Sequence, residues 1–452
     1  MIASPSPQAA SPEFRVELDR SLVNVEGRSV RHLVLTVRAP EPPPTDRPRD
    51  PLNLGLVIDA SGSMAGRPLD AAKAATLTML ESLADDNHLS IVSFAGDVIT
   101  HAQAVRLDPA GRSKIAGAVR PLVTRGNTAL FDGWVGGCQA VATRQAAADA
   151  TERNHVILLS DGHANAGECR PERLAHHAAE LRKRGVLTST VGIGRSYSPI
   201  QLQAIAEAGG GRMHDAEEPH EIAEIMLAEL NDTLATTVES LEFTLRLPRG
   251  VEPEIYGTTP LTRDAEGCDI LAGSLLGNAT RRIVVKLTFP GGQLGETLPI
   301  GVTARWKTPC DGREQTAELA AVAPRFDTAA ACLAQPRCRE LAKIVAEQWQ
   351  AHIYHRAMQL NQDGQREAAL AFATREGRYY DRYCADLPEM QAAVSSVHAF
   401  SPTVIHAYDQ VTAKEVFLRS HKTSRGEEDR RSSKRAEIEE LIRQAAGRYR
   451  QS

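Results

Sequence analysis

The segment between Leu52 and Leu230 constrains the fold most, because apolar strand patterns alternate there with amphipathic helix patterns. Continuous apolar runs such as LNLGLVID (52–59) and HVILLSDG (155–162) are typical of strands that are buried on both faces. Between them, RPLDAAKAATLTMLESLADD (67–86) has apolar residues at helical spacing. Strands that alternate with helices predict a mostly parallel sheet covered by helices on both faces, which is a doubly wound, Rossmann-like α/β domain.

The segments on either side of this α/β region have the period-two alternation of antiparallel strands. FRVELDRSLV (14–23) and VRHLVLTVRA (30–39) precede a proline-rich stretch, and further alternating segments lie between Val238 and Val322. A hairpin without further strands is only marginally stable. We therefore expect the N-terminal strands to join the later sheet, so that the α/β domain is inserted into an antiparallel β-sandwich.

Helical spacing returns after residue 330. RELAKIVAEQWQAHIYHRAMQL (339–360) and QREAALAFATREGRYYDRY (365–383) are separated by NQDG, which indicates a helical hairpin. The last segment carries many charges of both signs and is expected to be solvated. The expected organisation is a disordered leader at 1–13, strands completing the sandwich at 14–39, a proline-rich linker at 40–51, the α/β domain at 52–232, the β-sandwich at 233–325, a C-terminal helical domain at 330–418 and a charged tail at 419–452.

Composition and charge argue against several classes of protein. A chain of 452 residues with 42% hydrophobic and 24% charged residues has the balance of a globular protein with more than one domain. Its net charge of −5 argues against nucleic-acid binding through phosphate contacts. No stretch reaches the roughly 18 consecutive apolar residues that cross a bilayer, and no secretory signal pattern begins the chain. Because the seven cysteines include no C-x-x-C pair, we expect reduced thiols and a cytoplasmic protein without membrane contact.

Three strand-to-loop transitions in the α/β region carry oxygen-bearing side chains. DASGS follows the first strand and places Asp59, Ser61 and Ser63 at alternate positions. Thr128 precedes a helix in TRGNTALFDG, and Asp161 follows another buried strand. Ligands of open α/β sheets bind outside the carboxyl ends of the strands. We therefore expect these five side chains to lie close together.

Two carboxylates and three hydroxyls form an oxygen-rich donor set that suits a hard divalent cation. Mg²⁺ takes oxygen ligands at about 2.0–2.1 Å and readily keeps bound water, and Mn²⁺ or Ca²⁺ accept the same donors. Because most of these donors are neutral hydroxyls, the ion would remain electrophilic and could attract a carboxylate from another protein. Each loop alone also fits a turn or a helix cap, but the combination on one sheet favours a metal site.

Residues 52–230 resemble the von Willebrand factor type A (VWA) domain, a family that includes the integrin I domains. The resemblance rests on Asp59-x-Ser61-x-Ser63, Thr128 and Asp161, which match the family's metal ion-dependent adhesion site. It implies that the three hydroxyls bind the ion directly, whereas the two carboxylates act through water or switch to direct contact. The flanking sandwich and C-terminal helices are similar to bacterial cytosolic members, some of which accompany AAA+ ATPases or kinases and phosphatases.

The sequence therefore predicts a metal-dependent protein-binding module rather than an enzyme. The ion would coordinate an Asp or Glu of a protein partner, and the chain would act as an adaptor or regulatory subunit of an intracellular bacterial complex. Asn127, Asp132 and His163 are expected on the rim of this face, where they would contact the partner. Two alternatives stay open: a metal-dependent hydrolase with His163 as its base, and a scaffold in which the ion only clamps the loops.

Overall fold

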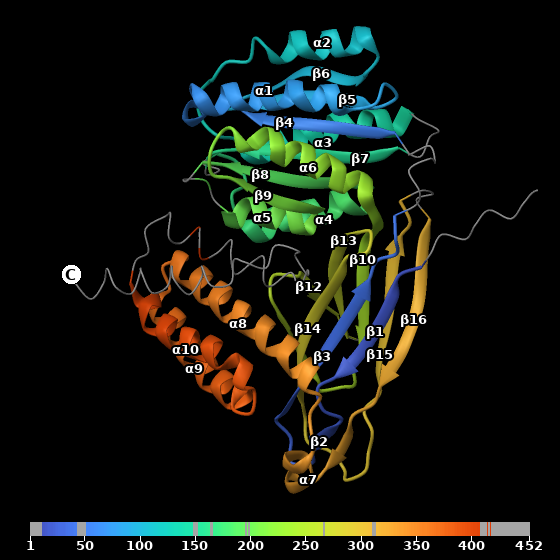
Figure 1. Ribbon diagram of the computed structural model, residues 1–452, viewed down its shortest axis with the longest axis vertical. Coiled ribbons are helices and arrows are strands. Elements are labelled where there is room, and N and C mark those ends of the chain that lie inside the picture. Colours follow the sequence, from blue (N-terminus) through green and yellow to red (C-terminus); the bar gives the residue numbers. More distant parts are fainter. Residues whose placement is uncertain are drawn as a thin grey trace, which may run out of the picture.

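The computed structural model describes residues 11–42, 51–147, 152–162, 166–194, 197, 199–264, 267–309, 313–406, 414 and 416. An α/β domain occupies one end of the molecule, a pair of antiparallel sheets occupies the other, and the C-terminal helices lie beside the sheets (Figure 1). The predicted charged tail, His163 and most of the predicted leader and proline-rich linker lie outside the described residues.

A six-stranded sheet forms the centre of the α/β domain, in the order β6-β5-β4-β7-β8-β9. Neighbouring strands pair in parallel, except that the edge strand β6 is antiparallel to β5. Strands β4 and β5 are buried along their whole length. This explains the apolar run of β4, whereas β5 also buries His88, Ser90 and Ser93. The strands are β4 (Leu52–Asp59), β5 (His88–Phe94), β6 (Val98–Arg106), β7 (Arg153–Ser160), β8 (Val186–Ile193) and β9 (Gly210–Ala216).

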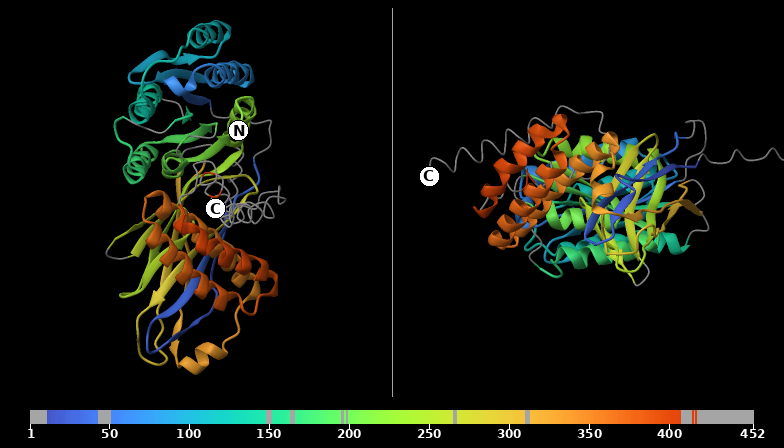
Figure 2. Two further views of the ribbon diagram at one scale, coloured as in Figure 1. Left: turned by 90° about the vertical axis from the view of Figure 1, so that its left-hand side faces the viewer. Right: turned by 90° about the horizontal axis from the view of Figure 1, so that it is seen from below.

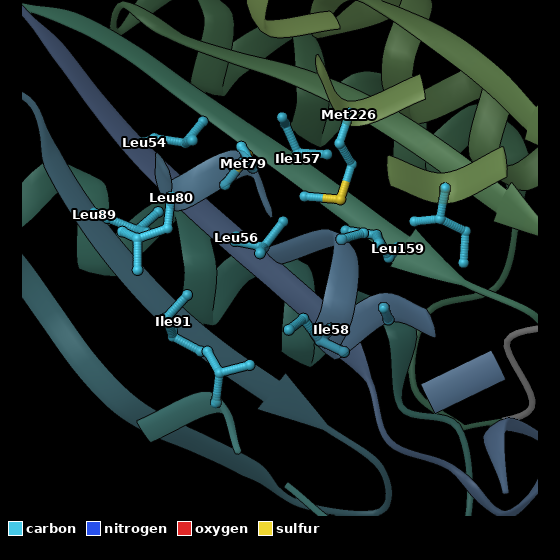
Figure 3. Packing of buried hydrophobic residues seen from close by; sticks show 14 of the residues in the cluster. Leu54, Leu56, Ile58, Met79, Leu80, Leu89, Ile91, Ile157, Leu159 and Met226 are labelled. Atoms are coloured by element: carbon cyan, nitrogen blue, oxygen red, sulfur yellow. The ribbon is translucent and has the colours of Figure 1, made fainter. Parts of the chain in front are cut away.

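Helices cover both faces of this sheet. Successive side chains of one strand point to opposite faces and pack in two separate hydrophobic cores. Leu56 of β4 packs in the core with α1, α2 and α6, whereas Val57 packs in the core with α3, α4 and α5. Figure 3 shows Leu56 and Ile58 of β4 on the same side as Met79 of α1 and Met226 of α6. The predicted doubly wound domain is therefore confirmed. The helices are α1 (Arg67–Ser82), α2 (Pro109–Val119), α3 (Leu130–Ala147), α4 (Pro171–Lys183), α5 (Pro199–Ala208) and α6 (Glu221–Ala235), with a short 3-10 helix η1 (Gly62–Met64) before α1.

Two antiparallel sheets, of order β1-β3-β14-β11 and β12-β13-β10-β15-β16, share one core beside the α/β domain. Leu35 of the first sheet and Phe243 of the second belong to this core. As expected, the N-terminal strands join the later sheet, because β3 pairs with β14 along its whole length. The strands are β1 (Glu13–Leu18), β3 (Ser29–Arg38), β10 (Thr236–Arg246), β11 (Glu252–Tyr256), β12 (Leu261–Arg263), β13 (Gly267–Leu276), β14 (Thr280–Phe289), β15 (Ile300–Lys307) and β16 (Glu314–Val322), with a separate small pair β2 (Leu22–Asn24) and β17 (Arg325–Asp327).

The C-terminal helices lie on one side of the two sheets (Figure 2). Trp349 and Ile353 of α8 share a core with Val34 of β3 and Val284 of β14, so the helices cover the outer face of the first sheet. No helix in the described part of the chain combines the length and apolar character needed to cross a membrane. The helices are α7 (Ala329–Ala334), α8 (Arg339–Gln362), α9 (Arg366–Cys384) and α10 (Gln391–Phe400), with 3-10 turns η2 (Pro388–Met390) and η3 (Ser401–Ile405).

Candidate metal centre

The carboxyl ends of β4 and β7 bring the two predicted carboxylates together. These strands are neighbours in register, with Ile58 opposite Leu159. Asp59 therefore ends β4 beside the residues that end β7, and Asp161 follows there. The Asp59 side chain is fully buried, and Asp161 is 8% exposed.

The DASGS loop turns back over this point through a chain of hydrogen bonds. The backbone N–H of Ser61 donates to Oδ1 of Asp59 at 2.8 Å, and the Ser61 and Ser63 hydroxyls lie 3.0 Å apart. The Ser63 hydroxyl donates to Oδ1 of Asp161 at 2.7 Å, which joins the DASGS loop to the loop that follows β7. Ser61 is buried but Ser63 is exposed, so the cluster opens to solvent on the Ser63 side.

Thr128 completes the group from a third loop, just before α3. A Cβ built on Gly162 would lie 3.6 Å from the Thr128 hydroxyl and 3.7 Å from the Ser63 hydroxyl, so both hydroxyls face the same glycine. The backbone N–H of Gly62 donates to the carbonyl oxygen of Gly126 at 3.1 Å, which connects the DASGS loop to the loop that precedes α3. The structure thus brings all five sequence-predicted donors to one edge of the sheet.

Ser160 belongs to the same cluster, although the sequence reasoning did not identify it. Its hydroxyl donates to Oδ2 of Asp59 at 2.6 Å, while Ser61 holds the other carboxylate oxygen. Both oxygens of Asp59 are therefore held in position. The available signal was a hydroxyl directly before Asp161, at the end of the apolar run 156–159 in the strand adjacent to β4.

Burial makes ionisation of the two carboxylates unfavourable, and a bound cation would offset this effect. Burial raises the pKa of Asp161 to about 6; the Ser63 hydrogen bond opposes this rise and the nearby charge of Asp59 adds to it. Burial also raises the pKa of Asp59, against its hydrogen bonds from Ser160 and Ser61. A divalent cation at this point would stabilise both ionised forms. The donor set therefore fits a hard metal ion.

Hydroxyl oxygens are essential to any such centre. Within the described ranges, no group of three or more His, Cys, Asp or Glu side chains is placed to hold a metal. The predicted rim residues Asn127 and Asp132 are both exposed. Asn127 directly precedes Thr128, and Asp132 lies in the first turn of α3. The third predicted rim residue, His163, is not among the described residues.

Comparison with known proteins identifies the α/β domain. Residues 53–227 match the model of the von Willebrand factor type A domain family. Inter-alpha-trypsin inhibitor heavy chain H3 of Homo sapiens is 36% identical over 174 residues, which are 37% of this chain and 20% of that protein. The matched segment thus spans about a fifth of that relative's length.

Two solved structures share the fold over nearly the whole chain. A von Willebrand factor type A protein from Catenulispora acidiphila has a TM-score of 0.64 at 19% identity, covering 92% of this chain and 98% of its own. The ArnB paralog VWA2 from Sulfolobus acidocaldarius has a TM-score of 0.57 at 13% identity, covering 92% and 99%. The α/β domain of this chain therefore has the fold of a VWA domain and matches that family's model along nearly its whole length. The VWA family consists of metal-dependent protein-interaction modules.

Proposed function

We propose that this protein binds a partner protein through a divalent cation held at the carboxyl edge of the VWA sheet. The observation that carries this proposal is the pair of buried carboxylates that accept hydrogen bonds from the Ser63 and Ser160 hydroxyls and from the Ser61 backbone N–H. Ser61, Ser63 and Thr128 would bind the ion, and Asp59 and Asp161 would complete its shell. Mg²⁺ is the proposed ion because all five donors are oxygens, and Mn²⁺ or Ca²⁺ could replace it.

The partner would present an Asp or Glu side chain to this ion. The cluster is open on the Ser63 side, where an incoming ligand could reach it. Hydroxyl ligands add no negative charge, so the bound cation would keep a net attraction for an outside carboxylate. In this binding role the chain would serve as an adaptor or regulatory subunit of an intracellular complex. The resemblance to bacterial members suggests AAA+ ATPases, kinases or phosphatases as partner classes.

Capture of partners from a lysate of the native cells tests this proposal. The immobilised full chain would be compared in Mg²⁺, in EDTA, and as the Thr128→Ala variant. Thr143→Ala is the matched control, because Thr143 is an exposed threonine on α3 away from the cluster. We expect a partner that is retained by wild type and Thr143→Ala in Mg²⁺ and lost in EDTA and in Thr128→Ala. A partner retained equally under all these conditions would show that binding does not use the metal centre.

A further inference from the structure

A recess separate from the metal centre lies between α9 and the outer face of the β1-β3-β14-β11 sheet. It has a volume of about 460 Å³ along the outer side of α9 and continues into a cavity of about 690 Å³ beside the sheet. Tyr379 and Arg382 line both hollows, so the two hollows adjoin along α9. We call the two together the basic groove, and the residues that define it here are Arg20, Arg28, Arg378, Tyr379 and Arg382.

Positive charge dominates the lining of the basic groove. Arg and Lys side chains outnumber Asp and Glu among its residues, although the whole chain has a net charge of −5. The acids that line it are largely engaged already. Asp19 pairs with His32 at 3.0 Å, Asp386 pairs with Arg337, and Glu376 accepts a hydrogen bond from the Trp349 ring nitrogen at 3.1 Å.

Several of the cations have no such partner. The Nε of Arg20 is buried without a hydrogen-bond partner. Arg28, Arg378 and Arg382 are exposed and make no ion pair with any residue that the structure describes. The exposed guanidinium groups can therefore pair with an anionic ligand in the groove.

The groove also offers a firm apolar surface. Tyr379 is 51% exposed at the point where the two hollows meet. Beneath it, Trp349 stacks on Tyr256 with ring centroids 5.3 Å apart, and the Arg337 guanidinium lies 4.6 Å from the ring centroid of Tyr383. These packed rings hold the walls in place, so that a ligand would meet a preformed surface.

We propose that the basic groove binds an extended acidic peptide segment of a partner protein. Its carboxylates would pair with Arg20, Arg378 and Arg382, since guanidinium groups bind carboxylates through two parallel hydrogen bonds. An apolar side chain of the peptide would pack on Tyr379. The spread of cations along α9 and onto the sheet suits an elongated ligand better than a compact anion. The acidic net charge of the chain disfavours a nucleic acid as the ligand.

Fluorescence anisotropy with the full chain tests this second site. The probe is a fluorescein-labelled peptide of alternating Glu and Leu residues, and the buffer contains EDTA so that the metal centre does not contribute. Competitors are the unlabelled Glu peptide, the same peptide with Gln in place of Glu, inorganic phosphate, and a single-stranded DNA oligonucleotide. The variants are Arg378→Gln and Arg382→Gln, and Arg15→Gln on the edge strand β1 is the control that removes an exposed arginine elsewhere.

We expect saturable peptide binding that weakens at least fivefold in each groove variant, remains unchanged in Arg15→Gln, and falls as salt is added. The unlabelled Glu peptide would compete, whereas the Gln peptide and phosphate would not. Equal affinity in all variants, absence of binding, or stronger competition by DNA than by the Glu peptide would overturn the proposal. Because the assay contains EDTA, its failure would leave the metal-dependent function untouched, and the lysate experiment tests that function separately.

Discussion

At the scale of single residues, the metal centre depends on how its carboxylates are held. One carboxylate oxygen of Asp59 accepts a hydrogen bond from the Ser61 backbone N–H, and the other accepts one from the Ser160 hydroxyl. The sequence predicted that the five side chains lie together, because they follow strand ends and a parallel sheet gathers such ends at one edge. It could not predict Ser160 as a supporting residue, because that role arises only when β7 lies beside β4.

Ser160→Ala should weaken metal binding without removing a donor. Loss of the hydroxyl leaves Oδ2 of Asp59 without its 2.6 Å hydrogen bond, so the carboxylate is no longer fixed. Residues that orient metal ligands commonly contribute about 10–100-fold to affinity, and we expect a loss of about tenfold here. Calorimetric titration with Mn²⁺ measures it, with the exposed Ser82→Ala as control. Equal affinities in the two variants would exclude this positioning role.

At the scale of elements, α3 approaches the sheet closely because of its glycines. A Cβ on Gly137 would lie 2.1 Å from a methyl carbon of Val57, and one on Gly133 would lie 2.3 Å from the Phe94 ring. Strands β4 and β7 were predictable because burial on both faces gives them apolar runs, at 54–58 and 156–159. In contrast, α2 was missed although Asp108 caps it and Pro109 begins it, because only a short apolar face marks its sequence.

Gly137→Ala should destabilise the VWA domain, because the added methyl group would push α3 away from β4. Overpacking of this kind costs about 1–3 kcal/mol of unfolding free energy. Gly117→Ala is the matched control, since a Cβ at Gly117 on α2 meets no atom within 4 Å. Replacing this helical glycine with alanine should be neutral or stabilising by up to about 1 kcal/mol. Urea denaturation of both variants distinguishes the two sites, and equal losses would contradict the proposed close packing.

Buried charges fix α6, the helix that leads from the VWA domain into β10. Glu229 is 2% exposed on its side chain, pairs with His214 at 2.6 Å and accepts a hydrogen bond from Ser189. Burial opposes the ionisation of Glu229, but His214, His155 and Arg212 outweigh it and hold the pKa at about 2. Side chains from β7, β8 and β9 thus anchor one residue of α6.

Glu229→Gln should cost on the order of 2 kcal/mol at neutral pH, because the Arg212 guanidinium and the His214 ring lose the carboxylate that they contact. A carboxylate whose folded pKa lies below its unfolded value stabilises the fold above the unfolded pKa and loses this effect as pH falls. The difference between wild type and variant should therefore shrink as pH falls below the ordinary Glu pKa of 4.5. Denaturant titrations between pH 5 and pH 3 would refute the assignment if the difference grew on acidification.

At the scale of the whole molecule, the chain returns from the C-terminal helices to the VWA domain. The Nζ of Lys414 lies 2.8 Å from a carboxylate oxygen of Asp215 on β9 and 4.3 Å from the ring centroid of Tyr197. Val416 is buried in the core that α8 and α9 share with the first sheet. The sequence predicted the insertion of the α/β domain into the sandwich, but a contact between such distant residues leaves no periodic pattern to read.

Lys414→Met should loosen this connection while keeping much of the side-chain volume. The variant removes the charge that Asp215 and the Tyr197 ring bind, so we expect faster amide hydrogen exchange in α5 and β9. Exchange in the hairpin of α8 and α9 should not change. Lys183→Met, at an exposed position in α4, is the control. Identical exchange in α5 and β9 of wild type and Lys414→Met would show that Lys414 does not hold the two parts together.

Titration of the purified full chain with Mn²⁺ by calorimetry tests the central claim most directly. The wild type should bind one ion per chain, with Mg²⁺ as a competitor. Asp161→Asn should weaken this binding at least tenfold, because it removes a carboxylate from the cluster. Asp70→Asn should not, because Asp70 is an exposed acid on α1. Absence of saturable binding to the wild type, or equal affinity in both variants, would contradict the assignment of a metal centre to Asp59, Ser61, Ser63, Thr128 and Asp161.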